Sequence, residues 1–377
     1  MINHRNIIST CSMWVITASI PVLIFLLIEG ILNIADFDFY STEVAFKRFD
    51  DYQVLHSISE ELGSDLRQNG LYKPYQSESY YINSHGVRTK EFSQKKKNED
   101  RTVVLGGSTV WGSSVSNHHT IPGFLEVILK RELPHNVITV YNLGVEGYTF
   151  ADELELITKF FHLIQPNQLV FYHGANDNTL NYLYLIGAQN ENHSGKSILV
   201  EKKTTMNWIK SSLRKLEIYK VLSFFIRSQI GNKSRLEIGR DLYEERLNKI
   251  VNNYFEQNLK AMRFCNEKKV TCYFILQPLI FHKQPLTRIE KTLVHRRLKK
   301  EPGLDTLYDD FVDRIMAKNK ANTVSEACNI FDFRMVLRGV EDILFGDFVH
   351  VNQHANQIIA EKIGDTLMKY RSSVDAD

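Results

Sequence analysis

The stretch VVLGGSTVWG, residues 103–112, passes from an apolar run into two glycines, a serine and a threonine. Aliphatic and branched residues followed by Gly-Gly predict a buried strand that ends in a tight turn. Ser108 then stands where a helix would begin. Taken alone, this pattern is commoner in a plain turn than in an active site. The rest of the chain therefore has to decide whether the Ser108 hydroxyl has a chemical role.

Four further segments resemble the apolar run before Ser108. The five predicted strands, all short and rich in branched or aromatic residues, cover residues 102–105, 137–141, 168–172, 270–276 and 329–333. Segments with helical periodicity separate them, such as the apolar stripe from Ile121 to Leu133. This alternation predicts an α/β fold in which helices cover both faces of a five-stranded, mainly parallel sheet.

The composition is that of a globular protein and excludes several classes of function. Hydrophobic residues make up 43% of the 377 residues and charged residues 24%, which is enough for a sizeable core. A formal net charge of +2, with no zinc-finger or RNP signature, argues against nucleic acid as a partner. His, Asp and Glu show no metal-ligand spacing, so we expect neither a metal nor a cofactor.

The four cysteines lack C-x-x-C spacing. We expect them to be buried small side chains rather than redox groups. Cys11 lies in the apolar N-terminal segment, so the other three, Cys265, Cys272 and Cys328, allow one disulfide at most. A fold held together by several disulfides is thereby excluded.

The N-terminal region predicts one transmembrane helix that acts as an uncleaved signal anchor. Residues 11–28 carry no charge, and a helix of this length would be about 27 Å long, close to the thickness of a bilayer core. Acidic residues follow, and basic ones return only at Lys47 and Arg48. The positive-inside rule then places the large domain outside the cell membrane, in the periplasm if the cell is Gram-negative. A cleaved signal peptide is the alternative, although no clean cleavage site follows.

We divide the chain accordingly. The divisions are a membrane anchor at 1–35, a lead-in packed on the main domain at 36–100, the main domain at 101–371 and a disordered tail at 372–377. Residues 181–240 interrupt the main domain as a basic helical insertion. This insertion is either a helical segment packed on the domain with its basic face in solvent, a lid over the site, or a helix on an anionic membrane surface.

Polar residues gather after the predicted strands, at the sheet edge where open parallel sheets bind ligands. They are Ser108, Gly144, Asn176, Asp347 and His350. A serine nucleophile needs a base, the base needs an orienting acid, and the developing oxyanion needs donors. His350 is the predicted base, and Asp347, three residues earlier, can hold its tautomer. The backbone N–H groups of Ser108 and Gly144 and the Asn176 amide are the predicted donors.

These residues follow one another in the chain as a serine, a glycine, an asparagine and a D-x-x-H pair. In this order, residues 101–371 resemble the SGNH (GDSL-type) hydrolases. The resemblance implies a three-layer α/β/α flavodoxin-like fold. It makes Ser108 the nucleophile, Gly144 and Asn176 the oxyanion donors, His350 the general base and Asp347 its orienting acid. The lead-in INSHGVRTKEF at 82–92, with the GGST variant, resembles the membrane-anchored bacterial branch of the family.

Two positions depart from the family pattern. Gly107 replaces the usual Asp before the serine, and Ala355 stands where a small glycine usually follows the histidine. Neither change removes a catalytic group. We expect Gly106 and Gly107 to leave room for substrate. The absence of G-x-S-x-G argues against the α/β-hydrolase fold.

The remaining histidines have no predicted chemical role. His118, His119, His282 and His295 are expected to be structural or surface residues. His173, close to Asn176, either lines the pocket or bonds to backbone at the end of its strand.

The resemblance implies a serine esterase or acylhydrolase that cleaves an O-acyl ester, such as an O-acetyl group, through an acyl-serine intermediate. The expected substrate is an acylated small molecule or glycan. An O-acyltransferase that modifies an envelope or extracellular polysaccharide would use the same residues, so it is the alternative. A non-catalytic glycan- or partner-binding envelope protein is a second alternative, disfavoured by the intact Ser108 and His350. The sequence gives no prediction of oligomeric state.

Overall fold

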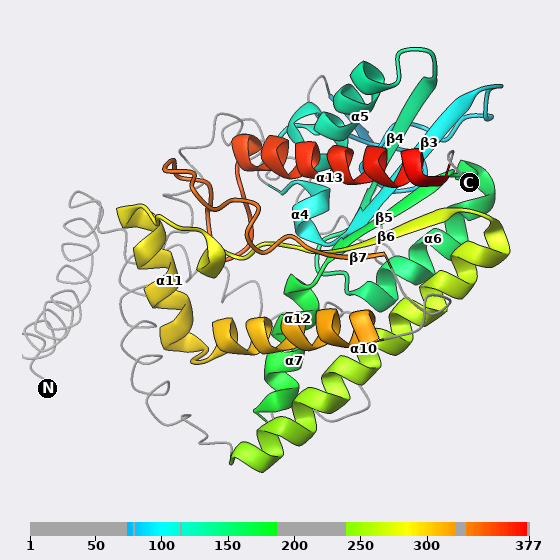
Figure 1. The fold of residues 1–377 in the computed structure, drawn as a ribbon. Coiled ribbons are helices and arrows are strands. Elements are labelled where there is room, and N and C mark those ends of the chain that lie inside the picture. Colours follow the sequence, from blue (N-terminus) through cyan, green and yellow to red (C-terminus); the bar gives the residue numbers. More distant parts are fainter. Residues whose placement is uncertain (1–73, 78–79, 114, 187–238, 322–328, 375–377) are drawn as a thin grey trace, which may run out of the picture. The chain divides into compact units, whose positions relative to one another are not determined.

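The computed structural model describes residues 74–77, 80–113, 115–186, 239–321 and 329–374, all within one compact unit (Figure 1). The predicted membrane anchor, most of the lead-in and residues 187–238 of the predicted insertion lie outside these described residues. Within them, no helix is both long enough and apolar enough to span a bilayer.

The core of the fold is a five-stranded sheet. Its strands are β3 (Glu99–Gly106), β4 (Val137–Gly144), β5 (Gln168–His173), β6 (Thr271–Leu276) and β7 (Ile330–Asp332). They lie in the order β4-β3-β5-β6-β7, and every neighbouring pair is parallel. Each strand coincides with one of the predicted segments, which confirms the α/β class. The strand of this sheet that comes first in the sequence, β3, is second from the edge, as in flavodoxin-like sheets.

Helices cover both faces of this sheet. The helices are α4 (Ser108–Trp111), α5 (Ile121–Glu132), α6 (Phe150–Ile164), α7 (Ala175–Leu185), α10 (Arg240–Lys268), α11 (Arg288–Lys300), α12 (Leu304–Ala321) and α13 (Gln353–Val374), with 3-10 turns η1 (Asn117–His119) and η3 (Ile280–His282). Because side chains alternate along a strand, Val103 and Leu105 pack in the core formed with α6, α10 and α12, while Val104 packs in the core formed with α5 and α13. The result is a three-layer α/β/α arrangement (Figure 1).

The C-terminal helix is longer than expected. Helix α13 ends at Val374, three residues inside the predicted disordered tail 372–377. No Gly or Pro stands between Asp365 and Val374, so nothing in that segment breaks the helix.

The described part of the lead-in forms a short antiparallel pair, β1 (Tyr75–Gln76) with β2 (Tyr81–Ile82), followed by an irregular segment. Tyr80, Ile82 and Val87 are buried in the same core as Trp111 of α4. This segment therefore packs against the helix that carries Ser108.

One disulfide is present among the described residues. Cys265, near the end of α10, and Cys272, at the start of β6, are both buried, as expected, but they are bonded to each other. The bond spans the turn at Lys269, whose φ is 56°. Cys11 and Cys328 lie outside the described residues.

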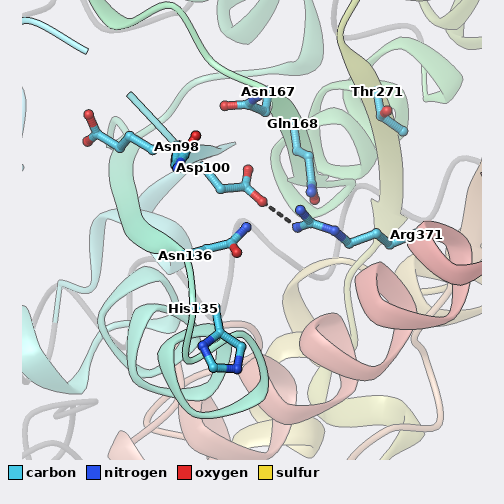
Figure 2. Close-up of a pocket in the computed structure, with 9 residues that line it drawn as sticks. Asn98, Asp100, His135, Asn136, Asn167, Gln168, Thr271 and Arg371 are labelled. Carbon is cyan, nitrogen blue, oxygen red and sulfur yellow. Dashed lines mark hydrogen bonds and ion pairs between the residues drawn. The ribbon is translucent and has the colours of Figure 1, made fainter. Parts of the chain in front are cut away.

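The amino-terminal edge of the sheet carries a polar hollow (Figure 2). Its lining residues are Asn98, Glu99, Asp100, His135, Asn136, Asn167, Gln168, Thr271 and Arg371. Arg371 of α13 forms an ion pair with Asp100 of β3 (Figure 2), which fastens the last turns of the helix to the sheet. None of the predicted site residues lies at this edge.

Candidate active site

Ser108 is the first residue of helix α4, directly after strand β3. The two preceding glycines make room for neighbouring protein atoms, and Gly107 also lines the hollow beside Ser108. The expectation of room for substrate is therefore corrected for Gly106 alone. A Cβ on Gly106 would lie 2.5 Å from the Tyr172 carbonyl oxygen, and one on Gly107 would lie 2.5 Å from Nδ2 of Asn176. The glycines therefore let the nucleophile turn approach β5 and the first turn of α7 closely.

The structure brings Ser108, His350 and Asp347 together in one series of hydrogen bonds. His350 Nε2 lies 2.6 Å from Ser108 Oγ, and His350 Nδ1 lies 2.6 Å from Asp347 Oδ2. The other Asp347 oxygen accepts the backbone N–H groups of Val349 (2.8 Å) and His350 (2.7 Å). The carboxylate is thus fixed by its own loop and can hold the imidazole with Nε2 facing the serine.

The electrostatics of the His–Asp pair suit a general base. Burial alone would lower the pKa of His350, but the charge and hydrogen bond of Asp347 raise it overall. Burial alone would likewise raise the pKa of Asp347, but His350 and the two backbone N–H groups lower it overall. Asp347 therefore stays ionised and stabilises the imidazolium that forms when His350 takes the Ser108 proton.

Asn176 lies in the first turn of α7, beside the nucleophile turn. Its Nδ2 donates to the Tyr148 carbonyl oxygen at 2.8 Å, which fixes the orientation of the amide. A side-chain amide nitrogen carries two N–H groups, so the second is available for a substrate oxygen. Ser108 is the first residue of helix α4, so its backbone N–H has no acceptor within the helix and is also a candidate donor to the substrate oxygen.

Gly144 does not have the position predicted for an oxyanion donor. Strand β4 continues as far as Gly144, which pairs with Gly106 of β3. Its N–H donates to Asn142 Oδ1 at 2.9 Å, and a Cβ on it would collide with the backbone nitrogen of Trp111. The residue is therefore glycine because strand β4 packs directly on helix α4.

The turn after β4 borders the site instead. Gly147 adopts a φ of 77°, a left-handed conformation that favours glycine. The residue after it, Tyr148, accepts the hydrogen bond of Asn176, and the residue before it, Glu146, accepts one from Ser113 at 2.9 Å. The Gly147 N–H is thus a third candidate donor, beside the Asn176 amide and the Ser108 N–H. The signal was present in the sequence as the second glycine of NLGVEGYT.

A buried arginine, which the sequence did not single out, supports the nucleophile helix. The Arg88 side chain donates to the carbonyl oxygens of Trp111 (2.7 Å), Gly112 (2.5 Å) and Val115 (2.6 Å), and to Asn117 Oδ1 (2.8 Å). These acceptors include the last residue of α4 and the loop that follows it. The guanidinium also lies 4.0 Å from the centroid of the Tyr80 ring. The lead-in thereby fixes the carboxyl end of the helix that begins with Ser108.

A second buried charge supports the loop that carries Asp347 and His350. Glu290 of α11 and Lys283 form an ion pair of 2.8 Å, with both side chains fully buried. The other Glu290 oxygen accepts the N–H groups of Leu344 (3.0 Å) and Phe345 (3.3 Å). Helix α11 thus holds the segment immediately before Asp347.

His173, at the end of β5, is part of a buried polar network beside the site. Its Nδ1 lies 3.1 Å from Glu153 Oε2 and its Nε2 lies 2.5 Å from the Tyr254 hydroxyl. Both ring partners are side chains rather than backbone groups, and His173 also lines the hollow beside Ser108, which was the other alternative. Burial lowers the pKa of His173 to about 4, so its imidazole is neutral near pH 7, and burial raises the pKa of Glu153 well above its usual value.

Several of these residues line a hollow beside Ser108. Its lining residues are Gly107, Ser108, Thr109, Tyr148, His173, Gly174, Ala175, Asn176, Asp177, Gln277 and Val349. They come from the carboxyl ends of β3, β5 and β6, the turn after β4 and the loop before α13, which is the sheet edge predicted for the site. Across the described ranges, no group of three or more His, Cys, Asp or Glu residues could hold a metal ion.

No protein-family model matches the chain, and no curated protein matches it. A lipase/acylhydrolase from Enterococcus faecalis is 15% identical over 71% of this chain and 95% of its own, with a TM-score of 0.39. The psychrotrophic esterase EstA from Pseudoalteromonas sp. is 12% identical over 72% and 99%, with a TM-score of 0.38.

An acetyl xylan esterase variant from Geobacillus stearothermophilus is 14% identical over 69% of this chain and 91% of its own, with a TM-score of 0.32. Similarity this low transfers no substrate or activity to this chain.

Proposed function

We propose that this protein is a serine hydrolase that cleaves O-acyl esters through an acyl-serine intermediate, and that it belongs to the SGNH hydrolases. One observation carries the proposal: the hydrogen bonds from Ser108 Oγ through His350 to Asp347 lie at the sheet edge that also holds the Asn176 amide. A nucleophile, a base, an orienting acid and an oxyanion donor thus meet at one place.

In the first half of the reaction, Ser108 Oγ attacks the ester carbonyl carbon while His350 Nε2 accepts the hydroxyl proton. The negative oxygen of the tetrahedral intermediate accepts hydrogen bonds from Asn176, the Ser108 N–H and the candidate donor Gly147. The C–O bond to the alcohol then breaks, and the alcohol leaves with the proton that His350 returns to it. An acyl group remains on Ser108 Oγ.

In the second half, a water molecule attacks the acyl carbon and His350 accepts its proton. Collapse of the second tetrahedral intermediate releases the carboxylic acid, and His350 returns the proton to Ser108 Oγ. Asp347 keeps its charge throughout and stabilises each imidazolium state.

We also place this domain outside the cell membrane, tethered by the N-terminal apolar segment. The uncharged stretch 11–28 and the acidic residues that follow it support this topology. The Cys265–Cys272 disulfide supports it independently, because disulfides persist in oxidising compartments.

Labelling by a fluorophosphonate probe tests the enzymatic proposal. We expect the wild-type chain to be labelled, the Ser108→Ala variant not to be labelled, and the Ser113→Ala variant to be labelled as the wild type is. Ser113 is the matched control because it is an exposed serine five residues away whose hydroxyl donates to Glu146 and to the Ser108 carbonyl oxygen but has no histidine partner. Equal labelling of the wild type and the Ser108→Ala variant would overturn the proposal.

A further inference from the structure

Helix α11 presents a cationic face to solvent. Its exposed residues are Arg288, Lys291, Thr292, His295, Arg296, Lys299 and Lys300. The single acidic residue of the helix, Glu290, is buried and paired with Lys283. Soluble protein surfaces usually intersperse charges of both signs, so a helix face with only cations is unusual.

Most of these cations are not neutralised within the described part of the chain. Arg288, Lys291, Arg296 and Lys299 form no ion pair with any described residue, whereas Arg297, on the side of the helix, pairs with Glu301. The four cations extend over residues 288–299, which is about 17 Å of helix. A row of charges of this length suits an extended polyanion better than a single small anion.

This helix lies next to the candidate active site. Glu290 bonds to the N–H groups of Leu344 and Phe345, three and two residues before Asp347. The Arg297 guanidinium lies 3.8 Å from the centroid of the Phe348 ring, and Phe348 stands between Asp347 and His350. Figure 1 shows α11, in yellow, beside the orange loop that leads to α13. Helix α11 thus contacts the loop that places His350 beside Ser108.

The apolar side chains of α11 argue for a hydrophilic partner. Leu293 is buried, and Ile289, Val294 and Leu298 pack against the hydrophobic cores. A helix that binds a bilayer surface keeps an apolar face free to enter it. On α11 that face is already used within the domain, so the observations favour a soluble polyanion over an anionic membrane.

We propose that the exposed cations of α11 bind an anionic glycan and that the ester cleaved at Ser108 is an O-acyl group on this acidic polymer. The inference rests on the proposed ester hydrolysis for its catalytic part and on charge complementarity for its binding part. It assigns the substrate class of the same site: a polyanionic, O-acylated polysaccharide.

Binding is tested with the full chain carrying Ser108→Ala, so that no turnover occurs, and with polygalacturonate as the probe. In this background Lys291→Glu, Arg296→Glu and Lys299→Glu are combined and compared with Lys260→Glu, Arg263→Glu and Lys362→Glu. The second set reverses the same number of exposed charges on α10 and α13. Reversing the α11 charges should weaken binding at least tenfold and reduce its dependence on salt, while the second set should leave both nearly unchanged.

Activity is then tested in the chain that keeps Ser108. We expect the α11 triple variant to lose kcat/KM on acetylated polygalacturonate by at least tenfold while its activity on 4-nitrophenyl acetate stays unchanged. A wild type that hydrolyses neither ester would contradict the proposed function and would leave the binding result to judge the inference. Equal binding of polygalacturonate by both triple variants would overturn the inference. So would binding only to vesicles of phosphatidylcholine and phosphatidylglycerol.

Discussion

His350 Nε2 lies 2.6 Å from Ser108 Oγ, although 242 positions separate the two residues in the sequence. Ser108 stands after the second strand in spatial order, and His350 precedes the helix that closes the domain. Contact between them therefore requires the whole sheet and the loop held by Glu290 to be in place. Several properties of the proposed enzyme follow from this pair and its neighbours.

Activity should depend on the protonation of His350. The base must be neutral to accept the Ser108 proton, and Asp347 raises the pKa of His350 above 6.5 despite its burial. We therefore expect kcat/KM to be low below that raised pKa, where His350 is protonated, and to rise as pH increases through it. In the Asp347→Asn variant the rate should fall and the inflection should move to lower pH. A profile that is flat from pH 5 to 9 in the wild type would contradict this role of His350.

Removing the Asn176 amide should lower the rate more than the stability. We expect Asn176→Ala to reduce kcat by about 10²- to 10³-fold, the effect of losing one oxyanion donor. The variant also loses the hydrogen bond to Tyr148, so Tm should fall slightly. Kinetics on 4-nitrophenyl acetate and a thermal melt measure the two effects. An unchanged kcat would exclude Asn176 from the oxyanion site.

The features that the sequence predicted well are those with a local signature. The strand β5, for example, is a continuous apolar run, and Asp347 and His350 lie three residues apart. No local pattern showed which of Gly144 and Gly147 is the candidate oxyanion donor. The end of β4 is set by the pairing of Gly144 with Gly106 of β3, which lies far away in the sequence.

The supporting charges could not be predicted for a related reason. Arg88 bonds mostly to backbone carbonyl groups 23 to 27 residues away, and Glu290 bonds to backbone N–H groups 54 and 55 residues away. Backbone groups are the same for every residue type, so such contacts leave no pattern in the sequence.

Gly144 should be required for folding rather than for catalysis. Gly144→Ala forces a Cβ against the Trp111 backbone, and overpacking of this kind costs about 1–3 kcal/mol or more. Gly239→Ala is the matched control, because a Cβ there meets no atom within 4 Å and the φ of −57° suits alanine. Chemical denaturation should show a large loss for the first variant and almost none for the second. Equal free energies of unfolding would mean that β4 does not pack on α4 in this way.

Arg88 should act on the position of Ser108 as well as on stability. In Arg88→Met, the carbonyl groups of Trp111, Gly112 and Val115 lose a charged donor. The Gly112 oxygen still accepts the N–H of Val115 at 3.2 Å, so the loss comes from the Trp111 and Val115 oxygens and from Asn117 Oδ1. A buried acceptor that loses its donor costs about 1–3 kcal/mol, so we expect a loss of at least about 3 kcal/mol. Arg88→Lys keeps the charge but not the planar set of donors, so it should fold better than Arg88→Met.

The kinetic readout separates positioning from folding. At a temperature where Arg88→Lys is fully folded, its kcat on 4-nitrophenyl acetate should be at least tenfold below that of the wild type, and KM should change little. Arg131→Met, which removes an exposed arginine from α5, is the control and should change neither kcat nor Tm. A folded Arg88→Lys variant with wild-type kcat would show that Arg88 stabilises the domain without positioning the nucleophile.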